Sequence, residues 1–91
     1  MEYQYPIDYE WSNEEMVQVI SFFNHVEAFY EDKVKRETFK ASYDQFKRIV
    51  PGKAEEKQIF KAFAKESGYE AYTVVKALRE APDATYLQQY K

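Results

Sequence analysis

The sequence predicts an all-α fold: a small four-helix bundle with an extended aromatic arm at the N-terminus. The residues after the fourth helix could form one more short helix. Apolar residues recur at spacings of three and four over four separate stretches. Capping and stop signals stand at the ends of these stretches. The links between them are short, which favours antiparallel neighbours. Residues 1–91 are predicted to form a single domain, because 91 residues leave no room for a second.

The first eleven residues are an aromatic arm. From Tyr3 to Trp11, Tyr, Ile and Trp alternate with other residues, which is the two-residue period of an extended chain. Because no second convincing strand is evident, we expect residues 1–11 to form an extended segment that packs over the helices.

The first helix is predicted over residues 13–31. Ser12 is a favoured N-cap, and Glu15, three residues later, completes a capping box. Glu14 and Glu15 also suit the first turn, where the helix dipole favours negative charge. The apolar face is broad and consists of Met16, Val19, Ile20, Phe22, Phe23, Val26, Phe29 and Tyr30.

Three further helices are predicted over residues 36–50, 53–67 and 70–81. Pro51 ends the second helix, since a prolyl ring disfavours helical geometry in the residue before it. Gly52 can cap the third helix, and Gly68 suits a left-handed C-terminal cap. Pro82 ends the fourth. Their apolar stripes are Phe39, Tyr43, Phe46 and Val50; Ile59, Phe60 and Phe63; and Ala71, Val74, Val75 and Leu78.

Two segments carry weaker signals. Residues 31–35 are polar and are predicted to be a plain connection. The last nine residues could form one more short helix, with Asp83 as its cap and with Tyr86, Leu87 and Tyr90 on its face.

Composition restricts the class of protein. The chain has no cysteine, so it lacks the disulfides on which small secreted domains often rely. No basic segment followed by an apolar run, as in a signal peptide, is visible. No stretch approaches the roughly 20 apolar residues of a membrane span. A cytoplasmic protein without a membrane partner is the expectation that remains.

The net charge of −3 conceals a polarity along the chain. Residues 1–32 carry eight acidic side chains and no Lys or Arg, whereas residues 33–61 carry nine basic and four acidic ones. Residues 62–91 have no net charge. An acidic first helix lying beside a basic second one would explain this polarity. The alternative is that the basic middle of the chain faces an acidic partner.

The residues needed for catalysis are scarce. Thiol chemistry is excluded, and a zinc site would have only His25 and carboxylates as ligands. His25 falls roughly 130° from the centre of the apolar stripe, so we expect it to point to solvent. There is no glycine-rich phosphate loop, because Gly52 and Gly68 are the only glycines. The sequence therefore predicts no enzyme, no catalytic, cofactor-binding or metal-binding residue, and no small-molecule substrate.

A helix-turn-helix is the second functional hypothesis. Ala64 and Gly68 have the required spacing between helices 53–67 and 70–81, and Tyr69, Tyr72, Lys76 and Arg79 would contact DNA. Ala77 stands where a larger apolar residue is usual. Acidic residues lie close by, and residues 62–91 have no net positive charge, although phosphate contacts dominate DNA affinity. Nucleic acid is thus the less favoured partner.

The favoured hypothesis is a non-enzymatic helical protein that binds another protein or itself. Tyrosine is enriched at protein interfaces, and several tyrosines cluster towards the C-terminal end, although they could equally close the bundle within one molecule. The candidate interaction surface consists of Tyr69, Tyr72, Lys76, Arg79, Tyr86 and Tyr90.

Several motifs resemble a known family over nearly the whole chain. They are Tyr3-x-Tyr5-Pro6-x-Asp8, Trp11-Ser12-x-Glu14-Glu15, the run from Ile49 to Lys57, Ser67-Gly68-Tyr69 and Val74-Val75-Lys76. They resemble uncharacterised protein family 0223, whose members are short cytoplasmic proteins of low-GC Gram-positive bacteria. The resemblance implies a small helical fold. It implies no function and supplies no catalytic or binding residues.

Overall fold

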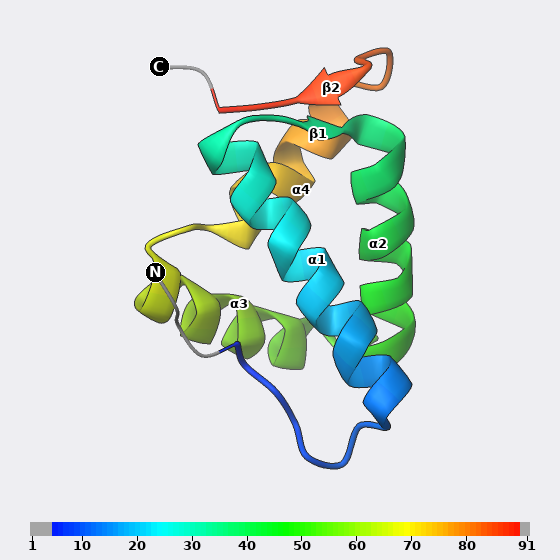
Figure 1. The fold of residues 1–91 in the computed structure, drawn as a ribbon, viewed down its shortest axis with the longest axis vertical. Coiled ribbons are helices and arrows are strands. Elements are labelled where there is room, and N and C mark those ends of the chain that lie inside the picture. Colours follow the sequence, from blue (N-terminus) through cyan, green and yellow to red (C-terminus); the bar gives the residue numbers. More distant parts are fainter. Residues whose placement is uncertain (1–4, 90–91) are drawn as a thin grey trace.

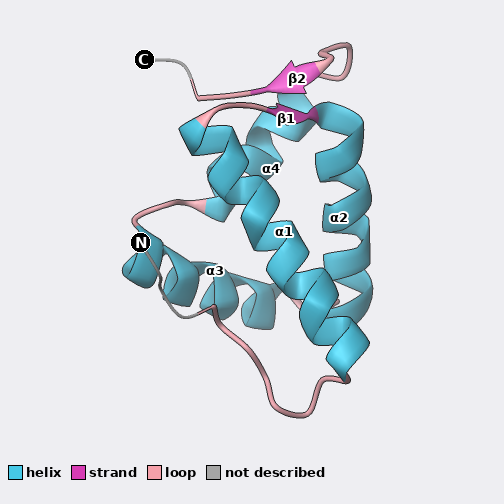
Figure 2. Cartoon of the chain, viewed as in Figure 1, coloured by secondary structure: helices cyan, strands magenta, loops and turns pink. Residues whose placement is uncertain are grey.

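Four helices and one pair of two-residue strands make up the computed structural model, which describes residues 5–89. The elements follow in the order α1 (Asn13–Glu31), β1 (Val34–Lys35), α2 (Arg36–Ile49), α3 (Lys53–Ser67), α4 (Ala71–Glu80) and β2 (Tyr86–Leu87). The prediction of an all-α fold is confirmed. Figure 1 shows α1 and α2 antiparallel and side by side, with α4 behind them and α3 running across their direction. Figure 2 shows that the strands are confined to one end.

The start of α1 forms both hydrogen bonds of the predicted capping box. The Ser12 hydroxyl oxygen accepts from the backbone N–H of Glu15 at 3.1 Å, and the Glu15 carboxylate accepts from the N–H of Ser12 at 2.8 Å. Two of the amide groups that a helix start leaves unpaired are thereby satisfied. This local arrangement fixes where the longest helix begins.

Aromatic rings fill the core around α1. Phe22 is fully buried, and its ring centroid lies 4.7 Å from that of Phe46 on α2 and 5.8 Å from that of Phe60 on α3. Phe23, also fully buried, stacks on Phe63 of α3 at 4.2 Å. Burial of these rings stabilises the fold through their large apolar area. Adjacent positions on one helix thus anchor two other helices.

The C-terminal segment does not form the short helix that we predicted. Beyond the turn that follows α4, Tyr86 and Leu87 form β2, which pairs antiparallel with β1 in the register Val34–Leu87 and Lys35–Tyr86. The expectation of a plain connection at 31–35 was also wrong, since Val34 is buried. Each strand turns one side chain inward and one outward, as a two-residue period requires. Two residues are too few for this period to be visible in the sequence.

Hydrogen bonds beyond the strand register hold the C-terminal segment in place. The N–H of Arg36 donates to the carbonyl of Thr85 at 3.0 Å, and the N–H of Gln89 donates to that of Phe29 at 3.1 Å. The ammonium of Lys33 lies 4.4 Å from the centroid of the Tyr86 ring, a cation–π contact. A buried leucine and paired backbone groups therefore favour the strand over a further helical turn.

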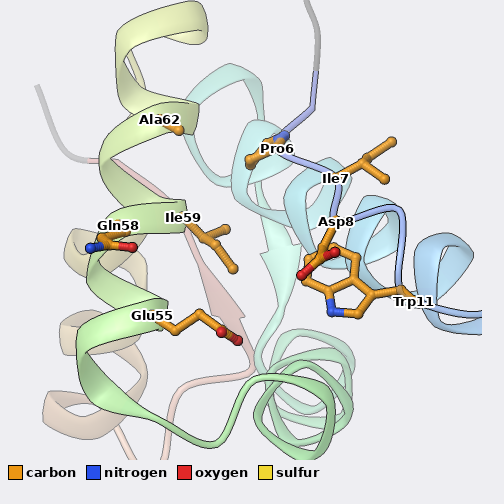
Figure 3. A pocket seen from close by; sticks show the side chains of 8 residues that line it. All are labelled: Pro6, Ile7, Asp8, Trp11, Glu55, Gln58, Ile59 and Ala62. Atoms are coloured by element: carbon orange, nitrogen blue, oxygen red, sulfur yellow. The ribbon is translucent and has the colours of Figure 1, made fainter.

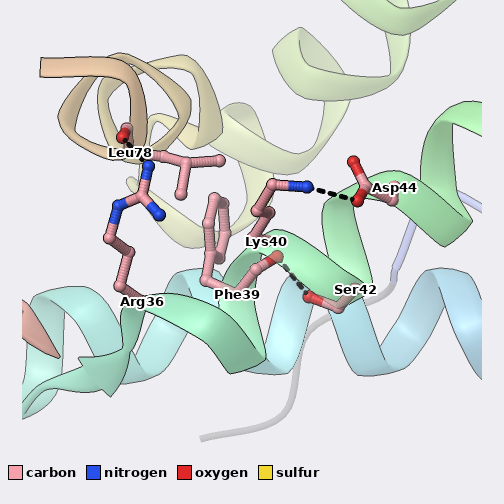
Figure 4. A network of polar contacts seen from close by, with 6 residues as sticks. All are labelled: Arg36, Phe39, Lys40, Ser42, Asp44 and Leu78. Atoms are coloured by element: carbon pink, nitrogen blue, oxygen red, sulfur yellow. Dashed lines mark hydrogen bonds and ion pairs between the residues drawn. The ribbon is translucent and has the colours of Figure 1, made fainter. Parts of the chain in front are cut away.

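Arg36 joins the start of α2 to the end of α4. Its Nη2 donates to the carbonyl oxygen of Leu78 at 2.9 Å, as Figure 4 shows beside the Lys40–Asp44 ion pair. The last carbonyls of a helix have no partner within the helix and carry partial negative charge. A guanidinium at this position therefore satisfies one carbonyl and complements the dipole of α4.

Gly68 separates α3 from α4 in a left-handed conformation, with φ 81° and ψ 3°. Its N–H donates to the carbonyl of Ala64 at 2.7 Å. The predicted cap is confirmed, because a residue with a Cβ meets a steric penalty at this φ.

Replacing Gly68 with alanine is expected to lower the free energy of unfolding by about 1–2 kcal/mol. A Cβ at this position would meet no atom within 4 Å, so the cost comes from the backbone alone. Urea denaturation followed by circular dichroism measures it. Asparagine, which tolerates this conformation better, should cost less. Equal losses for the two variants would contradict the backbone explanation.

In the described part of the N-terminal arm, Tyr5 packs against both α1 and α3. Tyr5 stacks near Phe23 and Phe63, with ring centroids 6.4 and 6.1 Å away. Its hydroxyl donates to the Glu27 carboxylate at 3.0 Å. Burial, followed by this hydrogen bond, raises the pKa of Tyr5 to about 12. The extended path ends at a turn over residues 9–10, where Tyr9 is exposed; Tyr3 lies outside the described residues.

His25 does not point to solvent as predicted. It is half-buried, and its Nδ1 lies 2.9 Å from the hydroxyl oxygen of Ser42 on α2. The helix-wheel angle was a poor guide, because α2 packs beside the apolar stripe and covers that flank of α1. Burial disfavours the imidazolium and lowers the pKa of His25.

Candidate functional site

A cavity of about 620 Å³ lies between α3, α4 and the side of α2, and we call it the basic groove. It lies within the usual size range of ligand pockets, about 300–1,000 Å³. Phe60, which is 6% exposed, and Ala64 contribute its apolar surface. Its other lining residues are Tyr43, Lys53, Glu56, Lys57, Lys61, Glu70, Tyr72 and Arg79.

Three lysines of α3 line the groove along one side of the helix. Lys53, Lys57 and Lys61 are spaced four residues apart, so they follow one another on one face over about 12 Å. All three are exposed, and none forms an ion pair with another residue between 5 and 89. These lysines therefore present positive charge to whatever enters the groove.

Of the two acidic side chains that line the groove, Glu56 is fixed by an ion pair and a hydrogen bond. Its carboxylate accepts from the Lys47 ammonium at 2.8 Å and from the Tyr43 hydroxyl at 2.9 Å. The ion pair balances the charge of Glu56. The second acidic residue of the groove, Glu70, is exposed at the N-cap of α4. The groove thus remains positive on balance.

The surroundings of Tyr43 raise the pKa of its hydroxyl. Burial, the hydrogen bond to Glu56 and the charge of that carboxylate raise its pKa to about 12, while the nearby Arg79 guanidinium opposes the shift. Protonated Tyr43 is therefore favoured in the folded chain.

Alkaline pH is expected to destabilise the native protein more than a Tyr43→Phe variant. The folded pKa of about 12 exceeds the ordinary value of 10.0, so this contribution is complete below pH 10 and is lost as the pH rises through 12. Free energies of unfolding at pH 9 and pH 11.5 test this for both proteins. The Lys47–Glu56 ion pair is present in both proteins, so it does not distinguish them. An equal loss in the two proteins would refute the role of Tyr43.

The candidate surface from the sequence is only partly assembled at this groove. Tyr72 and Arg79 line it, and Lys76 lies on the same exposed side of α4. Tyr69 instead stacks on Tyr30 at 4.8 Å, and its hydroxyl donates to Glu31 at 2.7 Å, which raises the pKa of Tyr69. Tyr86 belongs to β2 at the far end of the chain, and Tyr90 lies outside the described residues.

The α3 lysines of the groove are not among the site residues predicted from the sequence. The signal was present in the sequence as lysines at every fourth position of one predicted helix. The charge polarity pointed to the same region without naming these residues. What the sequence could not show is that α4 places Tyr72 beside them.

The structure also bears on the two interpretations of the charge polarity. α1 and α2 are neighbours. The ion pairs formed among residues 5–89 are Lys40–Asp44 and Lys47–Glu56, so both partners of each pair come from the basic region 33–61. Direct ion pairing between α1 and α2 therefore does not account for the positive charge of this region.

A second, smaller cavity of about 300 Å³ lies on the other side of α3, and we call it the arm pocket. It is lined by Pro6, Ile7, Asp8, Trp11, Glu55, Gln58, Ile59 and Ala62. Figure 3 shows Glu55 and Ile59 of α3 pointing across it towards Asp8 and Trp11 of the arm. The two cavities thus carry charge of opposite sign on opposite sides of one helix.

No arrangement for nucleophilic catalysis is found at the one histidine. The Ser42 hydroxyl, which lies 2.9 Å from the His25 Nδ1, donates to the carbonyl of Phe39 at 3.0 Å. A general base would have to accept the proton of that hydroxyl instead. Within residues 5–89 no group of three or more His, Asp or Glu side chains could hold a metal ion. No helix in this part of the chain is long and apolar enough to cross a membrane.

Comparison with known proteins decides the family. The sequence profile of an uncharacterised protein family, UPF0223, matches residues 2–87. The chain belongs to UPF0223. A UPF0223 protein of Staphylococcus saprophyticus is 63% identical over 83 residues, which is 91% of this chain and 90% of the relative. UPF0223 proteins of Staphylococcus aureus strains Newman and JH1 are each 58% identical over 79 residues, or 87% of both chains.

The UPF0223 assignment confirms the resemblance based on the sequence motifs. The family is described as uncharacterised, so its function is unknown. Membership therefore transfers no catalytic or binding residue to this chain.

Proposed function

We propose that this UPF0223 protein is a non-enzymatic cytoplasmic protein that binds an acidic, amphipathic segment of another protein in the basic groove. The observation that carries the proposal is an apolar surface bordered by lysines that form no ion pair with any of residues 5–89. Phe60 and Ala64 lie beside Lys57 and Lys61 in one cavity. A helix or strand that presents carboxylates next to apolar side chains would complement both features.

Exposure of Tyr72 supports a docking role. Tyr72 is 57% exposed, whereas Phe60 in the same groove is 6% exposed. Tyrosine gains binding energy at interfaces because its ring contributes a large apolar area and its hydroxyl contributes a hydrogen bond. We expect Tyr72 to pack against an apolar side chain of the partner, with the lysines of α3 paired to its carboxylates.

The helix-turn-helix alternative has less support. Ala71, Val74, Val75 and Leu78 turn one side of α4 into the core. Its exposed side carries Lys76 and Arg79 but also Glu80, and Glu70 stands at its N-cap. Phosphate binding would need more unopposed positive charge on α4. The exposed lysines of α3 that line the groove instead border an apolar surface, which suits a protein segment better than a duplex.

A direct binding experiment tests the proposal. The probe is a fluorescein-labelled helical peptide with Glu on one stripe and Leu on the next, and fluorescence anisotropy measures its affinity. We expect saturable binding that weakens with salt and weakens about tenfold or more, roughly 1.4 kcal/mol, in Lys57→Glu. Lys65→Glu changes the same charge on the same helix outside the groove and should bind with nearly unchanged affinity.

Three results would overturn the proposal. One is equal loss of binding in the Lys57 and Lys65 variants, which would indicate non-specific charge attraction. Another is displacement of the peptide by duplex DNA at lower concentration than by unlabelled peptide, which would favour the helix-turn-helix. The third is unchanged affinity in Tyr72→Ala. Sedimentation at the assay concentration shows whether a second copy of the chain occupies the groove instead.

A further inference from the structure

The arm pocket combines features that general folding does not explain together. Its two charged lining residues, Asp8 and Glu55, are both acidic, and its ring is that of Trp11, the only tryptophan of the chain. The position of Glu55 in the first turn of α3 suits the helix dipole. The helix dipole does not account for a second carboxylate from the arm or for an indole beside both carboxylates.

The arm fixes Asp8 and Trp11 relative to each other. The N–H of Trp11 donates to the backbone carbonyl of Asp8 at 3.0 Å, and the N–H of Glu10 donates to the Asp8 Oδ1 at 2.9 Å. This turn holds the carboxylate beside the indole before any ligand arrives. Trp11 itself is half-buried and packs against the core. The pocket is therefore preorganised, which lowers the entropic cost of binding.

The chemistry of the lining selects a particular cation. The negative face of an indole attracts a cation at about 6 Å or less from its centroid, and arginine is the side chain most often found there. A guanidinium can stack on the ring and hydrogen-bond a carboxylate with its planar fork at the same time. Ile59, Ala62 and Pro6 offer apolar walls to a methylene chain. A metal ion would gain nothing from these apolar side chains or from the indole, because none of them supplies a ligand atom.

We propose that the arm pocket binds the arginine side chain of a protein segment. The guanidinium stacks on Trp11 and pairs with Asp8 and Glu55, and its methylene groups contact Ile59. The site lies on the opposite side of α3 from the basic groove. It shares no lining residue with that groove, so this inference does not depend on the function proposed above.

Fluorescence of Trp11 provides a direct readout, since no other tryptophan contributes. The full chain is titrated with three capped tripeptides that differ only in their central residue: arginine, lysine or citrulline. Citrulline has nearly the shape of arginine without its charge. We expect a saturable change with the arginine peptide at about millimolar concentration, weaker binding of the lysine peptide and none of the citrulline peptide.

Variants separate the pocket from general negative charge. Asp8→Asn keeps an oxygen for the Glu10 N–H but removes the charge, and Glu55→Gln does the same on α3. Each is expected to weaken arginine binding several-fold, and the double variant more. Glu14→Gln removes a first-turn carboxylate of α1 outside the pocket and should leave the affinity unchanged. Circular dichroism verifies that each variant is folded.

Several outcomes would refute the arginine site. The arginine and citrulline peptides could give the same response, or Glu14→Gln could weaken binding as much as Glu55→Gln. Spermidine, a free polyamine, could bind more tightly than the arginine peptide, which would identify a small amine as the ligand. Absence of any fluorescence change, together with an unshifted indole N–H resonance in NMR at saturating peptide, would also reject the proposal.

Discussion

Replacing Phe22 with alanine is expected to lower the free energy of unfolding by about 3–5 kcal/mol. The side chain is fully buried, and its ring lies within 5.8 Å of those of five other aromatic residues. Removing it deletes these contacts and leaves a cavity where α1, α2 and α3 meet. Domains of this kind have a total stability of about 5–15 kcal/mol. Urea denaturation followed by far-UV circular dichroism should show a large fall in the midpoint.

Val17 provides the matched control for this prediction. It lies on the same helix but is 65% exposed, so Val17→Ala should change the free energy of unfolding by no more than about 0.5 kcal/mol. Phe22→Leu, which keeps most of the volume, should cost less than Phe22→Ala. If the Phe22→Ala variant were as stable as Val17→Ala, Phe22 would not be buried at the centre of the core.

Truncation of Leu87 to alanine is expected to cost about 2–5 kcal/mol. Leu87 is 3% exposed and joins the core from β2, opposite Val34. Its loss would detach the C-terminal strand from α1 and α4 and should also release the backbone hydrogen bonds on either side of it. Thermal unfolding measures the stability change. Hydrogen exchange at the amides of Arg36 and Gln89 reports on the strand itself.

Gln88 is the control for the C-terminal segment. It follows Leu87 and is exposed, so Gln88→Ala should leave both stability and exchange nearly unchanged. If Leu87→Ala behaved in the same way, residues 86–87 would contribute nothing to the core, and a frayed C-terminus would be the better description.

Part of the candidate site could be predicted from sequence. Tyr72 and Arg79 are candidates through the helix-turn-helix hypothesis, and their placement on the same side of α4 depends only on the helical repeat. Tyr69 is a candidate through the same motif. The left-handed turn at Gly68 directs it instead to Tyr30 and Glu31. Proximity along the chain is a poor guide across a turn, where the direction of the backbone changes.

The two cavities could not be predicted, because each one is formed by elements distant in sequence. The basic groove needs Tyr43 of α2, the lysines of α3 and Tyr72 of α4 in one place. The arm pocket needs the arm to cross α3. The approach of two helices depends on how their buried side chains fit together, and that fit is not encoded in the period of either helix alone.

The helices of this protein, with their caps and buried faces, follow from local signals in the amino-acid sequence. Ser12, Glu15, Pro51 and Gly68 act through hydrogen bonds and sterics within a few residues, so they can be interpreted from the chain alone. Three features follow from tertiary packing instead: Leu87 belongs to a strand, α2 covers His25, and α3 has cavities of opposite charge on its two sides. These features depend on contacts between distant segments, and a short strand has no local hydrogen-bond partner to reveal it.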